Sequence, residues 1–179
     1  MGEIVLAAKI THVPSIWLSE HSKKFKGIRQ NAIDGLVEIG RRAHDRKVDT
    51  YVIFDIHWVV NQGFHLNANA EHDGTFTSHE LPHFLNGMDY HFRGDPELAE
   101  KIAELGNARN LRVMAHRVPG LGFEYGTLIP MHHMNAAGSA RVLSIAGNQL
   151  ASIEEGRQFG EVVADAIRES DRRVAVLAS

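Results

Sequence analysis

A strand-helix-strand pattern opens this sequence and limits the possible folds more than any other feature. Glu3 to Lys9 is a short apolar run typical of a buried strand. Ile28 to Arg46 repeats apolar residues at helical spacing and has arginines in its last turns. Asp49 to Ile56 is β-branched and aromatic, which predicts a second strand. Two such strands joined by a helix lie parallel with a right-handed crossover, so we expect an α/β fold.

The rest of the chain extends this pattern. Asp95 and Pro96 are the N-cap and first residue of a helix expected to end near Ala108. Ser152 to Glu169 predicts a long amphipathic helix. Further strands are expected at Leu111 to His116, Arg141 to Ala146 and Arg173 to Ala178. The less regular parts are expected to be a loop (Thr11 to Lys26), an edge strand (Gly63 to Asn69), short strands and turns (Thr75 to Arg93), a glycine-rich loop (Gly120 to Tyr125) and a short helix (Thr127 to Asn135).

Length and composition favour one domain, residues 1–179. A chain of 179 residues, 44% of them hydrophobic, can bury one core and is too short for two domains to be expected. We therefore expect a single α/β domain in which helices cover a mostly parallel central sheet. The sequence ends with the last expected strand, and ligands of open α/β sheets bind beyond strand carboxyl ends. We therefore expect a fragment, or one part of a larger assembly.

Composition also narrows the chemistry. The absence of cysteine excludes disulfides and thiolate metal sites, so a metal must bind histidine, carboxylate, amide or water. A net charge of -3 with scattered basic residues argues against a nucleic-acid binder. Glu3 and a short apolar run fit neither a signal peptide nor a membrane anchor, so a cytoplasmic protein is expected. The 12 histidines favour a metal site.

Two histidines follow the first two expected strands. His12 lies just beyond the first strand and His57 at the end of the second. Parallel strands bring both imidazoles to the same edge of the sheet. Two histidines and one carboxylate on one face make up the facial triad that binds the metal in iron(II) oxygenases. The alternative is that each is a strand-end polar residue bonded to a nearby carbonyl. Because the two occupy matching strand ends, we favour the metal site.

Three further residues are candidates for the same site. Asp55 shares a strand face with His57 and is placed to orient an imidazole, or alternatively to cap a loop. Trp58 is either the wall of an aromatic pocket or a core residue. Tyr125 lies between a glycine-rich loop and a helix, where it is a candidate hydrogen-bond donor to a substrate oxygen. The alternative for Tyr125 is that it only packs.

The other histidines match no ligand pattern. His132 and His133 are adjacent on an expected helix and point about 100° apart, so we do not expect both in one site, and we expect at least one at the surface. Gly120-Leu121-Gly122 lacks the spacing and the lysine of a phosphate loop, so nucleotide binding is not expected. Solvated loop histidines are expected at His65, His72, His79, His83 and His91.

Several segments taken together resemble one enzyme family. They are Ala7 to Ser15 (AAKITHVPS), Phe54 to Trp58 (FDIHW), Glu80 to Phe84 (ELPHF), and Glu124 to Met131 (EYGTLIPM) with Met134-Asn135. These segments are spread over the whole chain. They look like the class III (LigB-type) extradiol ring-cleaving dioxygenases.

The resemblance implies a LigB-like fold, with iron(II) bound by His12 and His57. It implies that dioxygen cleaves a catechol beside its diol, most directly 3,4-dihydroxyphenylacetate in aromatic catabolism. Tyr125 matches a tyrosine that lines the substrate site in some relatives, and His83 falls in a matched motif at the expected pocket. The family's third iron ligand, a glutamate, and its acid/base histidine belong to a C-terminal part that has no matching positions here. Glu80 and Glu124 are conceivable stand-ins for that ligand, without support from a motif.

Three other functions remain open. A relative that acts on 2-aminophenol or protocatechuate would share the motifs. A non-catalytic subunit or truncated remnant would keep the fold without a complete site, and a hydrolytic zinc enzyme is also compatible with a histidine pair. We expect association with another chain, as a homo-oligomer or otherwise, and neither nucleic acid nor membrane as a partner.

Overall fold

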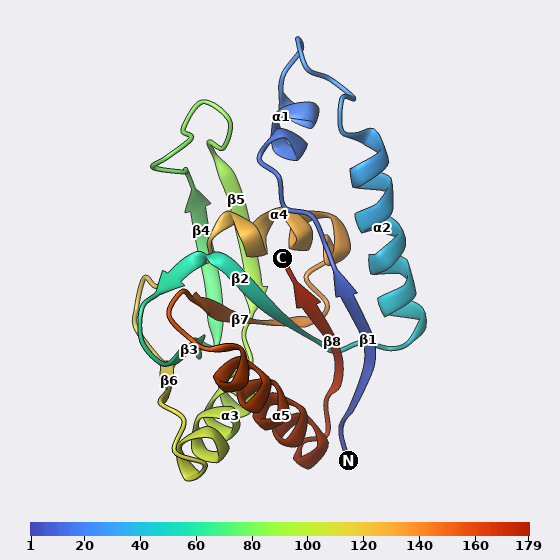
Figure 1. Cartoon of the computed structure of the whole chain (residues 1–179). Coiled ribbons are helices and arrows are strands. Elements are labelled where there is room, and N and C mark those ends of the chain that lie inside the picture. Colours follow the sequence, from blue (N-terminus) through green and yellow to red (C-terminus); the bar gives the residue numbers. More distant parts are fainter.

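A six-stranded sheet in the order β1-β8-β2-β7-β3-β6 forms the centre of the computed structural model, which describes residues 1–179 (Figure 1). β1, β8, β2 and β7 are parallel to one another, and β3 pairs antiparallel with β7 and parallel with β6. β4 and β5 form a separate antiparallel pair. The expected single α/β domain with a mostly parallel sheet is confirmed. In chain order the elements are β1 (Glu3–Lys9), α1 (Ser15–His21), α2 (Gln30–Asp45), β2 (Thr50–Val60), β3 (Phe64–Asn67), β4 (Glu71–Phe76), β5 (Met88–Arg93), α3 (Pro96–Ala108), β6 (Val113–His116), α4 (Tyr125–Met134), β7 (Arg141–Asn148), α5 (Ile153–Glu169) and β8 (Arg173–Ala178).

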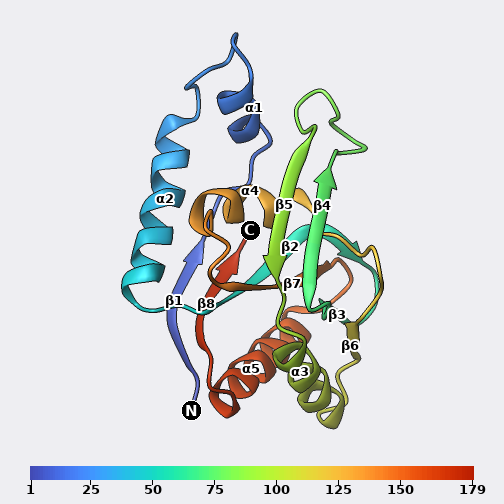
Figure 2. The ribbon, with the colours of Figure 1, turned by 180° about the vertical axis from the view of Figure 1, so that it is seen from behind.

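Helices cover both faces of the large sheet, as Figures 1 and 2 show from opposite sides. One core joins the sheet to α1, α2 and α4, and the other joins it to α3 and α5. β2 supplies both cores because successive strand residues point to opposite faces: Tyr51 and Ile53 enter the first core and Val52 the second. This burial on two sides explains the continuous apolar run of β2. None of the helices combines the length and apolar character that crossing a bilayer requires.

The last strand, β8, lies between β1 and β2 and pairs in parallel with both. The expected parallel direction of β1 and β2 is therefore confirmed, but the two strands do not pair directly. Because β1, β8, β2 and β7 run the same way, their carboxyl ends meet at one edge of the sheet. His12, His57 and Ser179, which lie far apart in the sequence, belong to this edge.

Three expectations for the irregular segments were wrong. The expected loop from Thr11 to Lys26 contains the short helix α1, whose Ile16 and Trp17 are buried although it is too short to show a clear period. β3 was expected at an edge, but β6 occupies that edge and β3 lies inside the sheet. α4 begins at Tyr125, so this tyrosine starts a helix rather than ending a loop.

His72 on β4 is buried, in contrast to the solvated position expected from the sequence. Its ring stacks on Phe123 with 4.0 Å between centroids, and neither ring nitrogen has a hydrogen-bond partner. Gly94 packs closely against this ring, since a Cβ on it would lie 2.8 Å from Nε2 of His72. Burial lowers the pKa of His72 to about 4.

We expect His72 to make the fold sensitive to acid. The unfolded histidine has a pKa near 6.5, so below that pH the unfolded chain binds a proton that folded His72 excludes until about pH 4. The free energy of unfolding therefore falls as pH falls through this window, by about 2 kcal/mol between pH 7 and pH 5 from this residue. In urea unfolding, the free energy of unfolding of His72→Phe should fall less between pH 7 and pH 5 than that of the wild type, by about 2 kcal/mol. The exposed control His91→Gln should lose as much as the wild type over the same pH range. Equal pH dependence in His72→Phe and the wild type would contradict this assignment.

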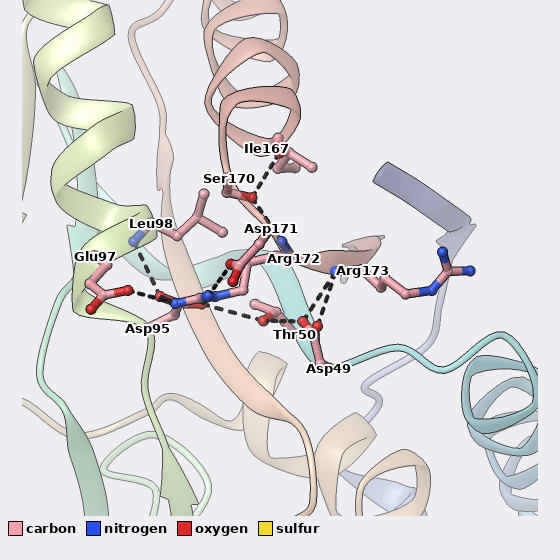
Figure 3. A network of polar contacts seen from close by, with 10 residues as sticks. All are labelled: Asp49, Thr50, Asp95, Glu97, Leu98, Ile167, Ser170, Asp171, Arg172 and Arg173. Carbon is pink, nitrogen blue, oxygen red and sulfur yellow. Dashed lines mark hydrogen bonds and ion pairs between the residues drawn. The ribbon is translucent and has the colours of Figure 1, made fainter. Parts of the chain in front are cut away.

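A buried ion pair closes the opposite, amino-terminal end of the strands (Figure 3). Asp95, the N-cap of α3, is 1% exposed and accepts from the backbone N–H of Leu98. Arg172, just before β8, binds Asp95 through Nε at 2.7 Å and also contacts Glu97 and Asp171. This network ties α3 to the start of β8.

Candidate metal centre and substrate cavity

His12 and His57 face each other at the carboxyl ends of β1 and β2, as the sequence predicted. Their Nε2 atoms are 3.0 Å apart and their ring planes are inclined by 77°. Two ligands at right angles, each about 2.1 Å from one ion, lie about 3 Å apart, so this spacing suits neighbouring ligand positions. The pairing of β2 with β7 is interrupted between Asp55 and Val59, which frees His57 from the regular strand alternation.

Ser179 sets the tautomer of His12. The Ser179 hydroxyl donates to the carbonyl oxygen of Gly126 at 2.5 Å and lies 2.9 Å from Nδ1 of His12. Because the hydroxyl has one proton, it must accept from Nδ1–H, which leaves the lone pair of His12 Nε2 directed at His57. Burial, followed by the neighbouring His57, lowers the pKa of His12. Both effects favour the neutral imidazole that binds metals.

Asp55 holds the backbone around this pair and does not contact an imidazole. Its fully buried carboxylate accepts from the backbone N–H of His57 at 2.8 Å and from the Thr127 hydroxyl at 2.7 Å. Ser144 lies 3.2 Å from the Thr127 hydroxyl and donates to it, because that hydroxyl has given its own proton to Asp55. Asp55 therefore links β2, α4 and β7, and the loop-capping alternative from the sequence is closer to the structure than orientation of an imidazole.

Gly126 leaves the space that the Asp55 carboxylate occupies. A Cβ on Gly126 would lie 2.2 Å from Oδ1 of Asp55, so a side chain there requires the carboxylate to move. We expect Gly126→Ala to lower the free energy of unfolding by about 1–3 kcal/mol. Gly35→Ala on α2, where a Cβ meets nothing within 4 Å, should stabilise by up to about 1 kcal/mol. Denaturant unfolding tests both, and a Gly126→Ala variant as stable as Gly35→Ala would disprove the steric explanation.

A cavity of about 160 Å³ opens beside the histidine pair. The ring of Tyr125 lies 3.9 Å from that of His57 between centroids, tilted by 32°. A second cavity of about 310 Å³ shares Phe76, His79 and Glu124 with the first and is walled by Trp58. The first cavity is lined by His57, Phe76, Ser78, His79, Glu80, Glu124 and Tyr125.

The surroundings of Tyr125 keep its hydroxyl protonated. Burial raises the pKa of Tyr125, and nearby carboxylates, that of Glu80 first among them, raise it further. Burial likewise raises the pKa of Glu124, with added effects of Asp55 and Glu80. Tyr125 can therefore donate a hydrogen bond to a ligand oxygen, the role for which the sequence made it a candidate.

Not all predicted residues gather here. Trp58 is half-buried in the second cavity, whereas His83 is exposed beside Phe84 and lines neither cavity. Glu80 and Glu124 line the first cavity but do not join the pair as a third ligand. One group of three or more histidine, aspartate or glutamate side chains has donor atoms within 4.8 Å of one another, and it lies elsewhere. His12 and His57 are therefore a pair of facing imidazoles with no carboxylate oxygen beside their donor atoms.

That separate group consists of Glu20, His132 and His133. The expectation that at least one of the two histidines lies at the surface is confirmed, since His132 is exposed. Their donor atoms lie closer together than the sequence suggested, because Glu20 approaches both from α1, an element that the sequence did not predict. The contact of Ser179 with His12 was also missed, because it depends on β8 lying between β1 and β2.

Comparisons with known proteins identify the family of this chain. Residues 6–179 match the protein family described as the catalytic LigB subunit of aromatic ring-opening dioxygenase. The chain is 44% identical over 180 residues to a 3,4-dihydroxyphenylacetate 2,3-dioxygenase from Escherichia coli, and spans 100% of its own length and 65% of that protein's.

A solved structure shares the fold. The crystal structure of an uncharacterized protein from Escherichia coli K12 superposes with a TM-score of 0.59 over 83% of this chain and 52% of that one. Its sequence identity is 16%, so this likeness concerns the fold alone. The family match, by contrast, covers nearly the whole sequence. This chain belongs to the LigB family of aromatic ring-opening dioxygenases.

Proposed function

We propose that this chain supplies the two histidine ligands of an iron(II) site and part of the catechol pocket of an extradiol ring-cleaving dioxygenase. The observation that carries the proposal is the facing pair of Nε2 atoms on His12 and His57, 3.0 Å apart beside the cavity that Tyr125 lines. Membership of the LigB family supports ring cleavage. The named relative makes 3,4-dihydroxyphenylacetate the first substrate to test.

The donor set suits iron(II). Two imidazole nitrogens with room beside them are the part of a facial triad that leaves positions for substrate and dioxygen. Iron, when bound, would hold both catechol oxygens and dioxygen and pass electron density from the one to the other. The third protein ligand is not brought to the pair by these 179 residues. We propose that it comes from outside them, which fits a relative of greater length.

The chain's own residues position the reactants. Ser179 holds His12 in the tautomer that presents Nε2, and Asp55 fixes the backbone of His57. Tyr125, kept protonated, donates a hydrogen bond to a substrate oxygen, while its ring and that of Phe76 give the cavity an aromatic wall. Such orientation of bound groups lowers the entropy cost of reaction.

The cavity also constrains the substrate's side chain. Glu80 and Glu124 line it, and two carboxylates disfavour an acidic substituent nearby. The acetate group of 3,4-dihydroxyphenylacetate must therefore point away from them. A neutral ring such as 2-aminophenol meets no such repulsion. Cleavage of 2-aminophenol is therefore the second candidate function.

Dioxygen uptake by the iron-loaded protein tests the proposal. The chain would be loaded with iron(II) without oxygen and then given 3,4-dihydroxyphenylacetate, protocatechuate or 2-aminophenol with dioxygen. We expect this chain to bind iron(II), and a longer chain that supplies the third ligand to take up one dioxygen per substrate consumed, fastest with 3,4-dihydroxyphenylacetate. Bound iron with no uptake of dioxygen by the longer chain with any of the three substrates would leave the non-catalytic subunit or remnant as the function. Tight zinc with no iron binding would instead favour a hydrolytic enzyme.

A further inference from the structure

A cluster of two histidines and a glutamate joins α1 to the far end of α4. Glu20 lies in the last turn of α1, and His132 and His133 lie in the last turn of α4. One donor atom from each lies within 4.8 Å of the other two. Tyr125 begins α4 seven residues before His132, which at 1.5 Å per residue is roughly 10 Å along the helix. The cluster is therefore separate from the cavity at His57.

The donor atoms are already close to the spacing that a metal requires. Nε2 of His133 and Oε2 of Glu20 are 3.4 Å apart. Two ligands about 2.1 Å from one ion at the tetrahedral angle are also about 3.4 Å apart. The His132 and His133 rings meet edge to face, with 5.0 Å between centroids. Small side-chain rotations would therefore bring all three donors to one ion.

Packing limits the freedom of the His133 side chain and partly that of Glu20, whereas His132 is exposed. The His133 side chain is 6% exposed, and that of Glu20 is 31% exposed. Trp17, buried on α1, stacks on His21 and makes a T-shaped contact with the His132 ring. Burial lowers the pKa of His133, although Glu20 opposes this effect. Neutral imidazole is the form that binds metals.

We infer that Glu20, His132 and His133 form a second metal site, for a divalent transition ion of the Zn²⁺ type. Two imidazoles and one carboxylate suit such an ion, whereas Mg²⁺ and Ca²⁺ prefer oxygen ligands alone. Both helices present their negative dipole ends to the cluster, which favours a cation there.

An ion at this site would hold α1 and α4 together, the two helices that lie next to the proposed iron ligands in the sequence or line the cavity beside them. α1 begins three residues after His12, and α4 begins with Tyr125. An ion bound at their far ends would fix α1 against α4 and stabilise the folded chain, since the unfolded chain lacks the preformed cluster.

Zn²⁺ titration in a His12→Ala/His57→Ala background tests this inference independently of the iron site. We expect one Zn²⁺ per chain by equilibrium dialysis, and a rise in Tm of about 5 °C or more at 100-fold excess of free Zn²⁺ over Kd. Adding Glu20→Gln or His132→Ala should weaken Zn²⁺ binding at least about tenfold, because each removes a ligand. Circular dichroism would show that each variant is folded.

Two substitutions serve as matched controls. Glu71→Gln and His91→Gln remove exposed side chains of the same types on β4 and β5, and should leave Zn²⁺ binding unchanged. If Glu20→Gln binds Zn²⁺ as tightly as these controls, or if the background variant binds no Zn²⁺, the cluster is only an ion pair and the inference is overturned. Wild-type protein should show the same dependence on Glu20, which guards against an altered fold in the background variant.

Discussion

Replacing His12 or His57 by alanine is expected to weaken iron(II) binding at least about 100-fold and to reduce catechol-dependent dioxygen uptake to background. The pair presents two nitrogen donors 3.0 Å apart, and one imidazole alone cannot hold the ion in a fixed geometry. Loss of a residue that merely supports a ligand already costs 10- to 100-fold in metal affinity, so loss of a ligand should cost no less. Anaerobic iron(II) titration and an oxygen electrode measure the two effects.

A suitable control is His44→Ala, which removes an exposed histidine on α2 that belongs neither to the first cavity nor to the Glu20 cluster. It should leave both iron binding and uptake at wild-type levels. Ser179→Ala is a milder test of the same site, because it removes the partner of His12 Nδ1 but keeps both ligands. We expect about tenfold weaker iron binding for that variant. Undiminished binding in both His12→Ala and His57→Ala would contradict the assignment of the ligands.

Replacing Arg172 by methionine is expected to lower the free energy of unfolding by about 3–5 kcal/mol. The substitution leaves Asp95, which is 1% exposed, without its cation, and an uncompensated buried charge is among the costliest defects in a fold. Arg172 also binds Glu97 and Asp171 in the same network (Figure 3), but both of those side chains are exposed and contribute little. Urea unfolding at neutral pH measures the loss.

The matched control for this prediction is Arg168→Met on α5. Arg168 pairs with Asp165 near the surface, with 62% and 26% of the two side chains exposed, so its loss should cost at most about 1 kcal/mol. The double variant Arg172→Met/Asp95→Asn should recover part of the stability, because it removes the buried charge as well. Equal stability of Arg172→Met and Arg168→Met would show that burial of Asp95 has no such consequence.

The regular elements could be predicted because their signals are local. Asp95 and Pro96 open α3 as cap and first residue, and α3 ends at the expected Ala108. Ser152 forms a capping box with Glu155 at the start of α5. The meeting of His12 and His57 was also predictable, since it requires only that two strands run parallel and end together.

The remaining features depend on contacts that no local pattern encodes. β8 enters the sheet between β1 and β2, and this placement alone brings Ser179 to His12. α1 has one buried turn, too short for a period, yet it carries Glu20 to His133. His72 was expected in solvent because polarity suggested a loop, and the stacking on Phe123 comes from a segment some 50 residues away.

Electron paramagnetic resonance of the nitric oxide adduct is the most direct test of the iron site. Anaerobic protein with iron(II) above its dissociation constant would be exposed to nitric oxide, and the half-integer-spin signal of the iron–nitrosyl centre would be quantified. We expect one such centre per chain at the histidine pair in Glu20→Gln, in which the second cluster lacks its carboxylate, and none in His12→Ala/His57→Ala/Glu20→Gln. A signal in that triple variant as strong as in Glu20→Gln would contradict the claim that His12 and His57 hold iron(II).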